Sequence, residues 1–316
     1  MKRRTLLIII VSMAVIASIV LGVTIWSFMQ QIERLRIGAV ALIELSGTIS
    51  YSSASLNIVS SGSITPSDVK YYVDQALSDP SIKAVVISIN SPGGSAAASE
   101  EIYQLIKRLA KSKPVVVYSP EVLASGGYYI SLPAQKIVVN PHALVGSVGA
   151  VMEIINIEDL LNKLGVNVTV LKSGVYKDIT SPFRPPTQKE IGILQDIINK
   201  TAQVFIERVR EHRNISDSEV FQARIYLGED AVKVGLADYV GTLDDAVNIA
   251  RQLAGLSPQA PVIKIEKPKG LLQQLLGLDI GIKGVEIKIG GPSNLESYLS
   301  TEFVGKPLYL WMPSPS

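Results

Sequence analysis

The stretch IKAVVISINSPGG, at residues 82–94, combines a strand-like apolar run with an abrupt break. β-Branched residues occur throughout residues 82–90, which predicts a buried strand. The Ser-Pro-Gly-Gly turn at residues 91–94 ends that strand, and residues 95–111 have the pattern of an amphipathic helix. A buried strand that leads through a turn into a helix is the beginning of a βαβ unit.

The same alternation continues along most of the chain. Further strands are expected at residues 40–49, 114–118, 136–139, 148–154 and 166–171. Helices are expected at residues 65–78, 157–164, 187–213 and 243–253, with a short helix beginning at Ser125 and a helix-turn-strand unit at residues 228–241. Strands separated by helices predict an α/β fold with a largely parallel sheet.

The first 36 residues differ from the rest. Lys2, Arg3 and Arg4 precede an uncharged run from Thr5 to Gln31. About 20 apolar residues span a bilayer, so this run is long enough to be a membrane anchor. The basic end should stay in the cytoplasm, which places the following residues outside the cell membrane in a single-pass topology. A cleavable signal peptide is the alternative, although the length of the run favours an uncleaved anchor.

Composition excludes several classes of site. The formal net charge is +2, and no arginine-rich stripe suggests a nucleic-acid partner. The chain has no cysteine, which excludes disulfides, thiol catalysis and zinc–thiolate sites. Its two histidines, His142 and His212, are too scattered to indicate a metal site. No cofactor is expected.

Proline residues suggest where the globular part ends. Ser257-Pro258 and Ala260-Pro261 follow the last clearly periodic helix, and the pattern after them is irregular. We therefore expect an anchor and linker at residues 1–36, one large domain at residues 37–256 and a C-terminal extension at residues 257–316. The apolar cluster Leu308–Trp311 near the end of that extension is expected to pack on a surface.

Two segments carry possible chemistry. Ser125 lies in ASGGYY, residues 124–129, and Lys177 lies in KSGVYKDITSPFRP, residues 172–185. A serine hydroxyl becomes a good nucleophile only when a base removes its proton. A lysine can be that base where burial makes its neutral form accessible. Taken alone, however, the pattern around Ser125 favours an ordinary helix-capping serine, and that around Lys177 favours a solvated loop charge.

Three motifs in order give these segments a stronger meaning. ASGGYYIS, GSVG and KSGxYKDIxSPFR resemble the membrane-bound signal peptide peptidases of the SppA type, which are Ser-Lys proteases. The resemblance extends from about Val40 to Gly241, and the Ser-to-Lys spacing, 177 − 125 = 52, suits that family. It implies a Clp-protease/crotonase-like α/β spiral of ββα units, behind one N-terminal transmembrane helix.

The resemblance also implies a role for each site residue. Ser125 is the nucleophile, Lys177 is the general base, and Ser147 of the GSVG segment orients the lysine amine. The oxyanion of the acyl-transfer step is held by backbone amides, which in this family point to Gly94 and Gly126. The implied activity is hydrolysis of hydrophobic or remnant signal peptides through an acyl-enzyme, in a homo-oligomer attached to membrane lipid.

Other interpretations of the site are open at this point. Clp-type proteases place a catalytic histidine after their serine, but the position of His142 before the GSVG turn suits a loop histidine. His212 lies at a charged helix end and is expected to be solvated. The alternative functions are a stomatin-associated membrane protease that also pairs Ser with Lys, a crotonase-type acyl-CoA enzyme and a non-catalytic membrane scaffold.

Overall fold

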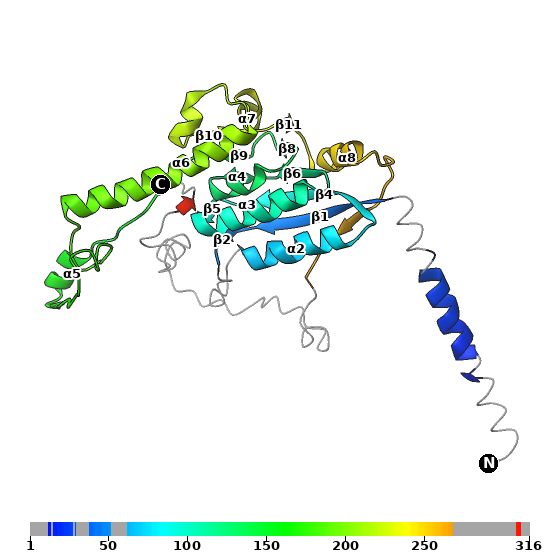
Figure 1. The fold of residues 1–316 in the computed structure, drawn as a ribbon, viewed down its shortest axis with the longest axis horizontal. Helices are drawn as coiled ribbons and strands as arrows, with labels where there is room; N and C mark the ends of the chain where they lie inside the picture. The colour runs from blue at the N-terminus through cyan, green and yellow to red at the C-terminus, as the bar shows by residue number, and fades with distance from the viewer. Residues whose placement is uncertain are drawn as a thin grey trace, which may run out of the picture.

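Six parallel strands form the main sheet of the computed structural model (Figure 1), which describes residues 12–13, 15–27, 29, 38–51, 62–267 and 308–310. The strands are, in spatial order, β11 (Tyr239–Val240), β8 (Lys136–Val139), β6 (Val115–Ser119), β4 (Ile82–Asn90), β1 (Ala39–Ser46) and β12 (Val262–Lys264). Every neighbouring pair in this sheet is parallel. The predicted α/β class is therefore confirmed.

Helices cover both faces of this sheet, which explains the continuous apolar run of its central strand. α2 (Pro66–Ser78), α3 (Ala96–Ala110) and α4 (Gly126–Ser131) share the larger core cluster with Val85 and Ile87 of β4. On the other face, α8 (Leu243–Leu253) packs with Val86. Successive residues of a strand point to opposite faces, so a strand buried on both sides needs apolar residues at every position.

Local capping signals place the helices as the sequence predicts. The Thr65 hydroxyl accepts a hydrogen bond from the Asp68 amide (3.1 Å) at the start of α2, and Pro66 is the first helical residue. Ser95 caps α3 in the same way. Each cap satisfies an amide that has no partner inside its helix.

Two smaller sheets lie beside the main one. The first contains β10 (Ile225–Leu227), β9 (Leu144–Gly146) and β7 (Val122–Ala124). The second contains β13 (Leu308–Leu310), β5 (Gly93–Ser95), β2 (Thr48–Ile49) and β3 (Ser63–Ile64). β13, from the C-terminal extension, lies next to β5 (Figure 1). The turn after the central strand is thus paired with a segment from the far end of the chain.

Residues 152–200, which we call the arm, project from this body (Figure 1). The arm contains α5 (Glu158–Lys163) and the first half of α6 (Gln188–His212). The strands predicted at residues 148–154 and 166–171 are wrong, because neither segment forms a strand. A strand needs a neighbour for its backbone hydrogen bonds. Val166, Val168 and Val170 are instead 45, 43 and 42% exposed.

The remaining described elements complete the body near α6. They are the 3-10 helix η1 (Ser218–Gln222) and the short helix α7 (Gly228–Lys233). β12 adds to β1 in the main sheet, so the sheet extends past residue 256, where the sequence predicts the large domain to end. Phe205 and Val209 of α6 are buried in the main core, which joins the second half of that helix to the body.

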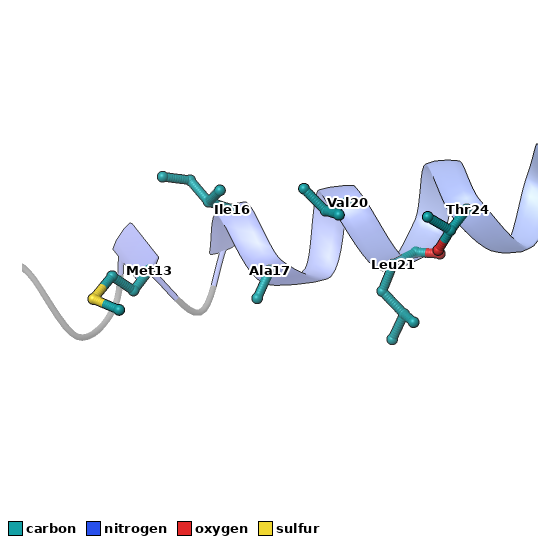
Figure 2. A pocket seen from close by; sticks show the side chains of 6 residues that line it. All are labelled: Met13, Ile16, Ala17, Val20, Leu21 and Thr24. Carbon is teal, nitrogen blue, oxygen red and sulfur yellow. The ribbon is translucent and has the colours of Figure 1, made fainter.

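The predicted membrane anchor lies partly outside the described residues. Residues 15–27 are helical. Figure 2 shows the six side chains that line a shallow pocket along this segment, Met13, Ile16, Ala17, Val20, Leu21 and Thr24. The Thr24 hydroxyl donates to the Leu21 carbonyl at 2.8 Å. Within the part of the chain that the structure describes, no helix is long and apolar enough to cross a membrane.

Candidate active site

Ser125 occupies a strained junction between β7 and α4. Its backbone has φ 51° and ψ −119°, a region that non-glycine residues rarely adopt. The Ser125 amide donates to the Gly146 carbonyl at 2.8 Å, and the Ser125 carbonyl accepts from the Tyr129 amide at 2.9 Å. Strain of this kind persists where the surrounding structure enforces it, often at functional sites. A serine on a sharp strand-to-helix turn is also the arrangement of a nucleophile elbow.

Ser147 lies in an equivalent position at the end of the neighbouring strand. β7 and β9 are parallel, and Ala124 is paired with Gly146, so Ser125 and Ser147 leave the two strands side by side. Ser147 has φ 55°, and its amide donates to the Arg224 carbonyl at 3.0 Å. In the described residues, only these two serines and Ala223 combine a side chain with positive φ. Two of the predicted site residues therefore lie side by side, just after the ends of two neighbouring parallel strands.

The Ser-Pro-Gly-Gly turn after β4 is hydrogen-bonded to β7, the strand that leads into Ser125. The Ser91 hydroxyl donates to the Gly47 carbonyl at 2.7 Å and accepts from the Gly93 amide at 3.2 Å. The Ser91 amide donates to the Val122 carbonyl at 2.8 Å, and the Ala124 amide donates to the Ser91 carbonyl at 3.2 Å. These bonds hold the turn against the strand that leads into Ser125.

Glycine makes the close packing around this turn possible. A Cβ on Gly127 would lie 2.6 Å from the Ser91 carbonyl oxygen, so no larger residue fits there. A Cβ on Gly94 would lie 2.1 Å from the Ile49 carbonyl oxygen. Gly126 is the first residue of α4, and its amide therefore has no acceptor within the helix. Because α4 packs on β5, both predicted oxyanion residues belong to the neighbourhood of Ser125.

An extended segment lies along β5, the short strand that contains Gly94. β13 is antiparallel to β5, with Leu308 opposite Ser95, Tyr309 opposite Gly94 and Leu310 opposite Gly93. On its other side, β5 pairs with β2 at Gly94. The backbone of β5 on the side opposite β2 can therefore pair with an extended segment in antiparallel orientation.

Lys177 lies elsewhere, on the arm. It is exposed, and its amide donates to the Gly174 carbonyl at 3.1 Å in a turn. Among the described residues, no hydrogen bond joins Lys177 to Ser125 or Ser147. In Figure 1 the connection between α5 and α6 lies outside the body, away from α4. A single chain thus brings the two serines close to the segments that contain Gly94 and Gly126. The pairing of Lys177 with Ser125 stays a prediction.

Charged residues fold the segment around Lys177 into a compact turn. Arg184 binds Asp178 through two hydrogen bonds (2.8 and 2.7 Å) and Glu190 through two more (2.8 and 2.6 Å). Lys172 donates to Asp178 at 2.7 Å. The hydrogen bonds from Arg184 and Lys172 hold the pKa of Asp178 well below its usual value. Those from Arg184 and Thr187 lower the pKa of Glu190 to about 2.

The motifs in the sequence do not by themselves predict this ion cluster. Its signals are present in the sequence: Asp178 and Arg184 belong to the YKDIxSPFR segment, and Thr187-x-x-Glu190 is a capping box. In the structure, the Glu190 carboxylate accepts from the Thr187 amide at 2.8 Å, and the Glu190 amide donates to the Thr187 hydroxyl at 3.3 Å. The pattern specifies the helix start, but it does not reveal that one arginine joins both carboxylates.

The two histidines have different environments. His142 is exposed in a turn, where its amide donates to the Asn140 side chain at 3.0 Å. The prediction that His212 is solvated is wrong: the residue is half-buried, and its Nε2 is 2.8 Å from the Tyr103 hydroxyl. Burial lowers the pKa of His212. Within the described ranges, no cluster of three or more His, Cys, Asp or Glu side chains could hold a metal ion.

Comparisons with known proteins agree on one family. Residues 107–257 match the family described as peptidase family S49. The chain is 45% identical to "Putative protease MJ0651" of Methanocaldococcus jannaschii, over 69% of this chain and 73% of that protein. It is 33% identical to "Serine protease SPPA, chloroplastic" of Arabidopsis thaliana, over 66% of this chain and 32% of that protein.

One solved structure also aligns over most of the chain. It is a mutant of the 1510-N membrane-bound stomatin-specific protease, with a TM-score of 0.46 and 18% identity. The alignment covers 73% of this chain and 99% of that chain.

Proposed function

The chain belongs to peptidase family S49, and on that basis we propose that it is a membrane-bound serine endopeptidase that cleaves hydrophobic peptides, such as remnant signal peptides. The observation that carries the proposal is the strained backbone of Ser125, beside Ser147 and the two glycine turns. A capping serine needs no positive φ, because N-cap residues ordinarily adopt extended conformations.

The reaction begins with attack of the Ser125 hydroxyl oxygen on the carbonyl carbon of the scissile peptide. The Lys177 amine takes the hydroxyl proton and later gives it to the leaving amine. The Gly94 and Gly126 amides donate hydrogen bonds to the oxyanion of the tetrahedral intermediate. Water then attacks the acyl-enzyme while Lys177 removes a proton from it. Collapse of the second tetrahedral intermediate breaks the ester bond, and Lys177 returns the proton to the Ser125 oxygen. Ser147 orients the lysine amine by a hydrogen bond.

The substrate binds as an extended strand along β5. Support comes from β13, which lies on that edge in antiparallel orientation opposite Gly94. Pairing with a strand edge recognises the peptide backbone, so this mode admits unfolded segments of varied sequence. A folded protein offers no free strand of this kind, which restricts the substrates to unfolded or membrane-derived peptides.

The active form is a homo-oligomer in which the arm of one copy brings Lys177 to Ser125 of another. Two observations support this assembly. Among the described residues of one chain, no hydrogen bond joins Lys177 to Ser125, and the arm exposes several large apolar side chains. Among them, Leu171, Val175 and Leu164 are 93, 71 and 67% exposed. Large exposed apolar patches typically mark protein interaction sites.

The N-terminal segment attaches this assembly to the cell membrane. Lys2, Arg3 and Arg4 stay cytoplasmic, the run from Thr5 to Gln31 is the single anchor, and the catalytic domain lies outside. This placement brings the active site to the side where cleaved signal segments leave the membrane.

Labelling with a serine-directed fluorophosphonate tests the proposed nucleophile. We expect one labelled residue, Ser125, with no labelling in Ser125→Ala and strongly reduced labelling in Lys177→Ala. His142→Ala is the matched control, because Clp-type proteases use a histidine instead, and it should label as the unchanged protein does. Labelling that persists in Ser125→Ala, or is lost in His142→Ala, would reject this mechanism.

A further inference from the structure

Arg184 holds two carboxylates with one guanidinium group. Its Nε and Nη2 donate to the two oxygens of Asp178, at 2.8 and 2.7 Å. Its Nη1 and Nη2 donate to the two oxygens of Glu190, at 2.8 and 2.6 Å. Bidentate pairs of this kind combine strength with a defined orientation, which lysine cannot reproduce.

The two carboxylates belong to different elements of the arm, the connection between α5 and α6 and the start of α6 itself. Asp178 follows Lys177 directly in the chain, whereas Glu190 is in the first turn of α6 and only 2% exposed. α6 is a 25-residue helix whose second half is buried in the main core through Phe205. Arg184 therefore connects the turn that carries Lys177 to a rigid helix anchored in the body.

The same contacts also determine the charge next to Lys177. A carboxylate beside a lysine favours the ammonium form and so opposes its action as a base. Here both Asp178 oxygens are occupied by cations other than Lys177, namely Arg184 and Lys172. Besides Lys177 itself, the charged side chains of this turn and of the adjoining start of α6 are Lys172, Asp178, Arg184, Lys189 and Glu190. Lys189 packs over the Tyr176 ring at 5.6 Å.

We propose that Arg184 is a positioning residue for the reaction: it fixes the Lys177 turn to α6 and keeps the Asp178 carboxylate from pairing with the Lys177 amine. This role rests on the proposed function, since it matters only if Lys177 is the general base. If the ion cluster only stabilised the arm, loss of Arg184 would lower stability and activity. It would not change the pH at which the enzyme becomes active.

The pH–rate profile of kcat separates these two roles. Arg184→Gln leaves Asp178 available to Lys177, so the midpoint of the alkaline rise should move to higher pH by about one unit. Asp178→Asn removes the carboxylate and leaves Arg184 near Lys177, so the midpoint should move to lower pH. The double variant Arg184→Gln with Asp178→Asn should return towards the unchanged midpoint. In Arg184→Gln, kcat should fall by at least about tenfold while KM changes little.

Lys200→Gln is the matched control. Lys200 forms an exposed ion pair with Asp196 at 2.6 Å on the same helix, and its loss should change neither kcat nor the profile. Arg184→Lys keeps the positive charge but loses the planar guanidinium group that binds each carboxylate through two hydrogen bonds. It should therefore retain the midpoint of the pH–rate profile and recover part of kcat. If Arg184→Gln does not fold, the midpoint of Asp178→Asn, which should move to lower pH, still tests the role of Arg184.

Two different failures can be distinguished. Unchanged midpoints in both Arg184→Gln and Asp178→Asn, with Lys177→Ala inactive, would overturn the role of Arg184 and leave the proposed function intact. Shifts of the two variants in the same direction would also overturn it, since they would indicate a structural effect. Full activity of Lys177→Ala would instead reject the proposed general base.

Discussion

The Ser125 amide donates a hydrogen bond to the Gly146 carbonyl at 2.8 Å, and this bond carries the register of β7 and β9 one residue past their ends. It holds Ser125 in a left-handed conformation directly beside Ser147, which is itself at φ 55°. Neighbouring parallel strands are about 4.8 Å apart, so two residues that leave such strands together begin within reach of a common ligand.

The close approach of α4 to the Ser91 turn should make Gly127 irreplaceable. Gly127→Ala places a methyl group 2.6 Å from the Ser91 carbonyl oxygen, a backbone atom that cannot rotate away. Overpacking of this kind costs about 1–3 kcal/mol and shifts the helix that follows Ser125. We expect a lower melting temperature and at least about tenfold slower fluorophosphonate labelling. Gly192→Ala, where a Cβ has no neighbour within 4 Å, is the control; equal behaviour of the two variants would contradict the prediction.

A site shared between copies predicts complementation of two inactive variants. Ser125→Ala and Lys177→Ala should each abolish peptide hydrolysis when expressed alone. Expressed together, they form mixed assemblies in which about a quarter of the sites combine an intact Ser125 with an intact Lys177. Activity should therefore reappear in the mixture and vanish on dissociation. A mixture as inactive as its parts would indicate that each chain completes its own site.

Activity should rise with pH. The Lys177 amine can remove the Ser125 proton only when it is neutral, and its neutral fraction increases as the pH rises. Below the midpoint, kcat/KM should therefore increase about tenfold per pH unit. Stopped-flow hydrolysis of a fluorogenic peptide across pH 5–10 measures this profile. A maximum near pH 5 would be incompatible with a lysine base.

The start of α6 should lose stability in acid. The folded-state pKa of Glu190 is about 2, below its unfolded value of 4.5, because Arg184 and Thr187 bind the ionised carboxylate. Its contribution to stability is therefore fully present above about pH 4.5 and is lost as the pH falls from there towards 2. Limited proteolysis between residues 172 and 190 should accelerate over this range. Glu190→Gln should be cleaved faster at neutral pH and should show a smaller change on acidification.

Removal of β13 should expose the strand edge beside Gly94. A chain ending at Pro307 lacks the residues that pair with β5, so substrate no longer competes with an internal strand. KM should fall by about twofold to tenfold with little change in kcat. A synthetic peptide with the sequence of residues 306–316 should inhibit the shortened enzyme. An unchanged KM would show that substrate does not use this edge.

The helix caps and buried strands could be predicted from short stretches of sequence. β-Branched residues throughout residues 82–90 specify a strand buried on both faces, and the strand runs from Ile82 to Asn90 as predicted. Thr65 and Ser95 specify helix starts because a side chain three residues away from an amide can satisfy it locally. The motif around Ser125 likewise predicts its role as the nucleophile.

Residues 148–154 and 166–171 show where this local information ends. The alternating valines of residues 166–170 have the pattern of a strand, and residues 148–154 are largely apolar. A strand forms only where another segment completes its backbone hydrogen bonds, and neither segment is paired along its length. His212 was expected to be solvated because its own helix is charged, yet Tyr103, more than 100 residues earlier, covers it.

The sequence alone determined the parallel α/β class and the approximate helix boundaries, because both depend on periodicity or on contacts within a few residues. The candidate site residues came from the resemblance of their motifs to a known family, and their roles stay predictions. Only the tertiary structure determined that Ser125 and Ser147 lie side by side at the ends of two strands, and that Arg184 joins Asp178 to Glu190. It also placed the connection between α5 and α6, which carries Lys177, away from α4. These relationships depend on how separate elements pack, and packing is set by contacts between side chains and backbone that no local pattern encodes.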